Sequence, residues 1–122
     1  MSAEIETLVT EIENASETSE ALERKIAQVA GVVAAKDRLH FLSDLDEAVE
    51  LPGRRGWNFA LSSERTGERR HFGAWIYMPG SREEVLSHAQ AWHPAEAVVL
   101  AFLKGMREIR RLERSPAFGR RL

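Results

Sequence analysis

Four histidines are the side chains of this 122-residue chain best suited to proton transfer or metal binding: His40, His71, His88 and His93. His88 and His93 are five residues apart, so they do not share one helical face as the i, i+4 pair of a zinc-binding helix does. The chain has no cysteine, which excludes thiolate ligands, disulfides and a cysteine nucleophile. We therefore expect surface or partly buried histidines, with no metal and no cofactor.

The serines and carboxylates have structural explanations. No Gly-x-Ser-x-Gly motif and no glycine-rich phosphate loop occurs in the sequence. Ser43 is placed to cap a helix, and Asp44 and Asp46 suit the first turn of that helix, where the dipole favours negative charge. We expect a non-enzymatic protein, because an enzyme would need a histidine–carboxylate cluster that the linear sequence does not display.

Arginines are concentrated in two regions of the sequence. The larger is residues 104–122, and the other comprises Arg54, Arg55, Arg65, Arg69 and Arg70. Seven glutamates and no base occur in residues 1–23, whereas residues 104–122 hold seven bases against two glutamates. Complementarity to a helix dipole explains much of this pattern. The alternatives are that the arginines bind a nucleic-acid backbone, a nucleotide or another anion, or that they make charged contacts between subunits or partners. The candidate anion contacts are Arg54, Arg55, Arg107, Arg110, Arg111 and Arg114.

The aromatic residues suggest a binding surface. Trp57 and Trp75 are predicted to fill the core. Trp92 follows a region without clear periodicity and is a candidate interface anchor, because tryptophan is enriched at binding hot spots. Tyr77 and His93 complete the predicted protein interface. The net charge of −2 gives no general electrostatic reason to expect nucleic acid or a membrane as partner.

The stretch 41–61 contains the elements that position these side chains. Leu45, Ala48 and Val49 recur at helical spacing after the Ser43 cap, and Pro52 with Gly53 is predicted to end that helix. The period then changes to two, which predicts a strand with Trp57, Phe59 and Leu61 on one face.

The rest of the chain is mostly helical. Residues 3–14 and 17–30 predict two antiparallel helices. Residues 94–114 predict a long C-terminal helix, in which residues 97–103 are apolar almost all round and the apolar stripe is narrower after them. The polar residues 62–70 predict a hairpin loop, and residues 71–78 the returning strand. Both faces of this strand carry large side chains, so it should be central or covered on both sides. Residues 32–40 fit either a helix or a loop, residues 82–93 fit either a helical turn or an irregular loop, and the tail 115–122 should be flexible.

The predicted architecture is one α+β domain over residues 1–122. It has a helical N-terminal part (3–30), a helix-turn-hairpin unit (43–79) and the C-terminal helix, with a small antiparallel sheet between the N-terminal helices and the long C-terminal helix. No window approaches the roughly 20 apolar residues of a membrane span, and the acidic N-terminus does not resemble a secretory signal. We expect the protein in the cytoplasm.

Two segments resemble the phage ABA sandwich domain family of small phage and prophage proteins. They are residues 41–48, FLSDLDEA, with Leu51-Pro52 and Gly56-Trp57 after them, and residues 93–104, HPAEAVVLAFLK. The resemblance covers residues 4–108. It implies a phage or prophage gene and helices on both faces of a small sheet, and it implies no activity. We therefore expect an accessory protein in the bacterial host cytoplasm that binds a host or phage protein or itself; inhibition of a host-defence complex is one such role.

Overall fold

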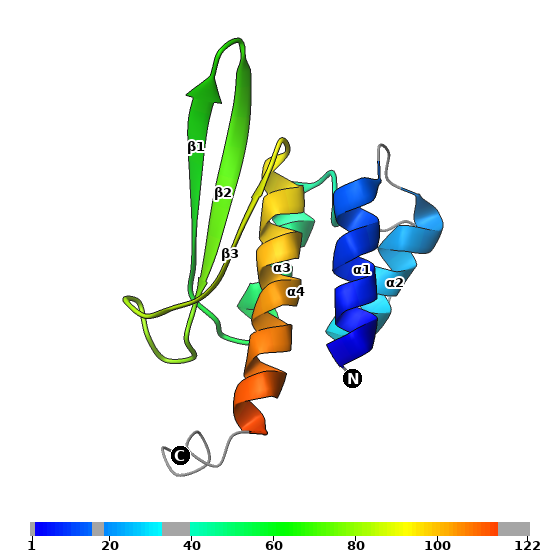
Figure 1. Cartoon of the computed structure of the whole chain (residues 1–122), viewed down its shortest axis with the longest axis vertical. Helices are drawn as coiled ribbons and strands as arrows, with labels where there is room; N and C mark the ends of the chain where they lie inside the picture. The colour runs from blue at the N-terminus through cyan, green and yellow to red at the C-terminus, as the bar shows by residue number, and fades with distance from the viewer. Residues whose placement is uncertain (1, 16–18, 33–39, 115–122) are drawn as a thin grey trace.

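The computed structural model describes residues 2–15, 19–32 and 40–114, and the predicted flexible tail lies outside these ranges. The α+β class is confirmed, because four helices accompany a three-stranded antiparallel sheet in these residues (Figure 1). The elements are α1 (Ser2–Asn14), α2 (Glu20–Ala30), α3 (Leu45–Arg54), β1 (Phe59–Thr66), β2 (Arg69–Tyr77), β3 (Val85–Ala91) and α4 (Pro94–Glu113).

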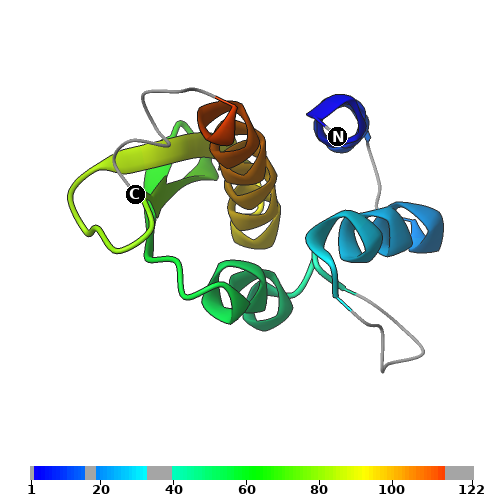
Figure 2. The ribbon, with the colours of Figure 1, turned by 90° about the horizontal axis from the view of Figure 1, so that it is seen from below.

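The order of the layers differs from the expected one. Helix α4 packs on β2 and β3 with one side and on α1 and α3 with its other sides, so α4 and not the sheet is the central layer (Figure 2). The physical reason lies in α4, where Ala97, Val98, Val99 and Phe102 are all fully buried. A helix that is apolar all round needs neighbours on every side. One face of the sheet is therefore covered by α4, and no described helix lies on the other.

Helix α4 begins where the sequence predicts. The Nδ1 atom of His93 accepts a hydrogen bond from the Ala95 N–H at 3.2 Å, and Pro94 occupies the first turn, where its missing N–H costs nothing. Gly105 lies where α4 crosses β3. A Cβ atom at this position would lie 3.0 Å from Ser87 Oγ, so glycine permits the close approach of helix and strand.

Helix α3 differs from the prediction at both ends. Its N-cap is Asp44, whose Oδ1 accepts a hydrogen bond from the Asp46 N–H at 2.9 Å, so the assignment of the cap to Ser43 was wrong. The helix also continues through Pro52 to Arg54. Proline fits in this last turn because its fixed φ is helical. Few residues of the helix follow it, so the backbone hydrogen bond that proline cannot donate interrupts little of the helix.

The sheet has the order β1-β2-β3, so the prediction of a central second strand is confirmed. The predicted hairpin loop at 62–70 is much shorter in the structure. Thr66 pairs with Arg69, and only Gly67, at φ +67°, and Glu68 make the turn. Residues 85–91, for which the sequence fits either a helical turn or a loop, form the third strand, and its register with β2 shifts between Ile76 and Tyr77.

Candidate functional site

The outer face of the sheet, on the side away from α4, carries a row of aromatic side chains. Strand alternation places Tyr77, Trp75 and His71 of β2 on this face, while Ala74 and Ile76 are fully buried on the opposite, inner face. On β3, His88 lies opposite Trp75. We call this surface the outer aromatic face, and its members are His71, Trp75, Tyr77, His88 and Trp92.

The centre of the outer aromatic face is a stacked pair. The rings of Trp75 and His88 are parallel to within 28°, with their centroids 4.8 Å apart. Gly73 provides the space for the indole, since a Cβ atom there would lie 3.0 Å from Trp75 Cη2. The assignment of Trp75 to the core was therefore wrong, because its ring is only half-buried on the outer face. Trp57, by contrast, is partly buried against the core, 5.5 Å from the Phe102 ring.

Trp92 lies at the end of the outer aromatic face and is 53% exposed. The His71 ring meets it edge-on at 5.8 Å, and the Arg69 guanidinium lies over the indole at 4.4 Å from the ring centroid. His71 Nε2 is in turn 3.6 Å from Glu64 Oε2. A half-exposed indole fixed between a cation and a second ring is a rigid contact surface, which lowers the entropy lost on binding.

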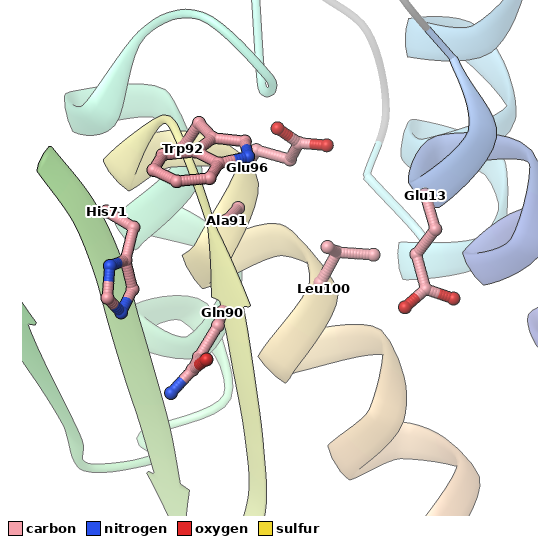
Figure 3. A pocket seen from close by; sticks show the side chains of 7 residues that line it. All are labelled: Glu13, His71, Gln90, Ala91, Trp92, Glu96 and Leu100. Atoms are coloured by element: carbon pink, nitrogen blue, oxygen red, sulfur yellow. The ribbon is translucent and has the colours of Figure 1, made fainter. Parts of the chain in front are cut away.

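A cleft of about 480 Å³ opens beside Trp92, between β3 and the helices (Figure 3). In Figure 3 its wall runs from His71 and Gln90 on the sheet to Leu100 on α4 and Glu13 on α1. Ala91, Trp92 and Glu96 complete the lining. The cleft is therefore continuous with the outer aromatic face at Trp92 and reaches the helical side of the protein.

Two carboxylates give the cleft an acidic character. Burial raises the pKa of the Glu96 carboxyl above its ordinary value of 4.5, with His93 lowering it and Glu13 raising it by smaller amounts. Glu13 Oε2 is 3.6 Å from the Lys104 ammonium. The described residues show no group of three or more side chains placed to hold a metal ion. The cleft suits a polar or basic group of a partner better than an anion.

The predicted interface residues do not form one cluster. Tyr77 pairs with Val85 at one end of β2, whereas Trp92 lies opposite the His71 end, and Trp75 with His88 connects them. His93 is exposed, and its Nδ1 serves as the N-cap of α4, so its contact is structural. Arg69, His88 and Glu96 were missed as site residues. Alternation along residues 71–78 places His71, Trp75 and Tyr77 on one face, whereas the pairing of β3 with β2, which brings His88 to Trp75, is not visible in the sequence.

The predicted anion-binding arginines are dispersed over two helices. Arg54 ends α3, and Arg55 donates to the Ala30 carbonyl at 3.4 Å and lies over the Trp57 and Phe102 rings at 5.4 and 5.5 Å. Arg111 pairs with Glu108 at 2.8 Å. The others lie in or directly after the last turns of α4: Arg107, Arg110 and Arg114. Contacts among the described residues thus occupy Arg55 and Arg111, and binding of an anion stays a prediction.

In the described ranges, no helix is long and apolar enough to cross a membrane. No family model, no curated protein and no solved structure matches the chain. The resemblance to the phage ABA sandwich domain family therefore depends on the sequence motifs alone.

Proposed function

We propose that the chain is a non-enzymatic accessory protein of phage or prophage origin that acts in the bacterial cytoplasm by binding another protein through its outer aromatic face. The observation that carries this proposal is the half-exposed stack of Trp75 on His88, on a sheet face that no described helix covers. Tryptophan, tyrosine and arginine are the residues that most often dominate protein interfaces.

The distribution of side-chain size over the sheet supports this proposal. Large rings that serve only folding are normally placed toward the core, where burial of apolar area stabilises the fold. Here the buried part of the inner face carries Ala74, Ile76 and Ala89, with Phe72 partly buried beside them, whereas the two largest rings of β2, Trp75 and Tyr77, are on the outer face. Trp92 with Arg69 over it adds a pre-organised anchor at the end of this face. The phage origin is supported by the motif resemblance of residues 41–48 and 93–104.

Affinity capture from a bacterial host lysate tests the proposal. The baits are the wild type, Trp75→Ala, Trp92→Ala and, as a control on the opposite side of the molecule, Arg24→Ala. Arg24 is exposed on α2 and pairs only with Glu20 of the same helix among the described residues. We expect mass spectrometry to identify a protein captured by the wild type and by Arg24→Ala and lost with both tryptophan variants.

Each bait is checked by circular dichroism, so that loss of capture is not loss of fold. A captured protein that is retained by both tryptophan variants would show that another surface binds it. A protein lost equally with Arg24→Ala would point to a general effect of substitution. Either result contradicts the assignment of the outer aromatic face as the binding surface.

A further inference from the structure

The two edges of the sheet are protected to very different degrees. Strand β3 packs along α4, and a register shift interrupts its pairing with β2. Strand β1 packs closely only on β2 among the described elements, and it forms the outer border of the sheet in Figure 1. Its register with β2 is continuous over all eight residues from Phe59 to Thr66. A long, regular and uncovered edge is the form most prone to pair with another strand.

The free backbone groups of β1 can be assigned from the register. The Tyr77 N–H donates to the Asn58 carbonyl at 3.0 Å, which makes Asn58 and Tyr77 a hydrogen-bonded pair. Because such pairs alternate along an antiparallel ladder, Ala60, Ser62 and Glu64 direct their backbone groups to β2. The intervening residues direct theirs away from the sheet: Phe59, Leu61, Ser63 and Arg65.

Few of the devices that protect an edge strand occur in β1, whose two charged residues, Glu64 and Arg65, both lie near its end. The strand FALSSERT contains no proline, no lysine and no bulge. At its start, the Phe59 ring is 37% exposed, although it belongs to the inner face, because α4 packs on β2 and β3 and not closely on β1. The inner side of β1 therefore has room for side chains from a neighbour.

We infer that β1 pairs with β1 of a second copy of this chain, in antiparallel orientation, and joins two sheets into one of twice the width. The inference concerns the edge of the sheet and does not depend on the proposed function of the outer aromatic face. Two-fold symmetry makes such a contact self-complementary, since the same backbone groups serve in both copies.

The side chains favour a register with the two-fold axis at Ser62. In that register Ser63 pairs with Leu61 of the second copy, and their outward backbone groups meet. Arg65 lies opposite the exposed ring of Phe59, a favourable cation–ring contact, and Glu64 lies opposite Ala60. A register centred on Glu64 would oppose two glutamates and is disfavoured.

Sedimentation equilibrium with a matched pair of variants tests the inference. Ser63→Pro removes an outward N–H from β1 without removing a bond to β2, and Ser63→Ala removes the same hydroxyl while it retains that N–H. The hydroxyl accepts a 3.2 Å hydrogen bond from Arg70, which both variants lose.

We expect the wild type and Ser63→Ala to sediment at twice the 13.8 kDa chain mass. For Ser63→Pro we expect the dimer dissociation constant to rise about tenfold or more. A monomeric wild type, or a Ser63→Pro dimer of unchanged affinity, would overturn the inference.

Amide hydrogen exchange gives a second test that needs no variant and does not depend on how well Ser63→Pro folds. In a monomer, the amide of Ser62, bonded to β2, is protected, while those of Leu61 and Ser63 exchange rapidly. In the dimer we expect Leu61 and Ser63 to be protected to the level of Ser62, and to lose this protection on dilution. Rapid exchange of Leu61 and Ser63 at every concentration would refute the pairing.

Discussion

At the centre of the sheet, the two faces reverse the usual relation between side-chain size and burial. The inner face packs on α4 with Ala74, Ile76 and Ala89, which are at most 3% exposed. The outer face carries Trp75 stacked on His88, both at least partly exposed. Ala74 and Ala89 leave room for the close approach of α4, whereas the outer rings have no described helix to pack against. Stability should therefore depend on the inner face and binding on the outer one.

The largest effect should come from Phe102, the largest side chain that α4 buries completely. Phe102 is fully buried and contacts Trp57 with ring centroids 5.5 Å apart. Phe102→Ala should lower the free energy of unfolding by about 3–5 kcal/mol, because it removes a large apolar surface and leaves a cavity. Urea denaturation measures this decrease. A decrease below about 1 kcal/mol, the common effect of an average substitution, would show that the core does not centre on α4.

Gly105→Ala should have the next largest effect. The added methyl would lie 3.0 Å from Ser87 Oγ, whose hydroxyl donates to the Ala101 carbonyl at 2.7 Å. The strain of overpacking, about 1–3 kcal/mol, should exceed the gain of about 1 kcal/mol from replacing a glycine inside a helix. Urea denaturation of Gly105→Ala and of the double variant Gly105→Ala with Ser87→Ala separates the two effects. If the close approach is the cause, removal of the Ser87 hydroxyl should recover part of the stability.

Trp75→Ala should cost much less, although it removes the largest side chain of β2. Its ring is half-exposed, and the substitution chiefly removes the stack on His88, so the expected decrease in unfolding free energy is about 1 kcal/mol. A parallel urea titration with Phe102→Ala makes the comparison direct. A decrease as large as that of Phe102→Ala would mean that the outer ring serves the fold, and its assignment to binding would fail.

The same contrast explains which parts of the fold were predictable from sequence. Helix α4 and strand β2 were predicted because long apolar or alternating patterns fix their period and their faces. Strand β3 was not, because Leu86 and Ser87, next to each other at the register shift, both face the core, and the sequence there gives no hydrophobic alternation. Apart from Leu86, the residues that face α4 are the small Ser87, Ala89 and Ala91. Those residues are small because Gly105 brings α4 so close, and that approach is a tertiary property.

The candidate site was predictable only in part, for a related reason. Trp92 and Tyr77 were recognised as exposed aromatic candidates, but their relation through Trp75 and His88 requires the β2–β3 register. The cleft joins Glu13 of α1 to Glu96 of α4, residues far apart in the sequence. No local pattern reports that two such carboxylates share one cavity.

The smallest predicted effect concerns this cleft and is a change with pH. Because burial raises the pKa of Glu96 above 4.5, the folded chain holds this proton more tightly than the unfolded chain does. Ionisation of Glu96 therefore lowers stability as the pH rises from about 4.5 through the raised pKa.

The variant Glu96→Gln lacks this titration. The difference in Tm, wild type minus Glu96→Gln, should fall over that interval and then become constant. Scanning calorimetry at closely spaced pH values measures the difference, in which groups that titrate equally in both proteins cancel. A difference that rises with pH would mean that a positive group, such as protonated His93 or a cation drawn into the cleft, outweighs the burial of this carboxylate.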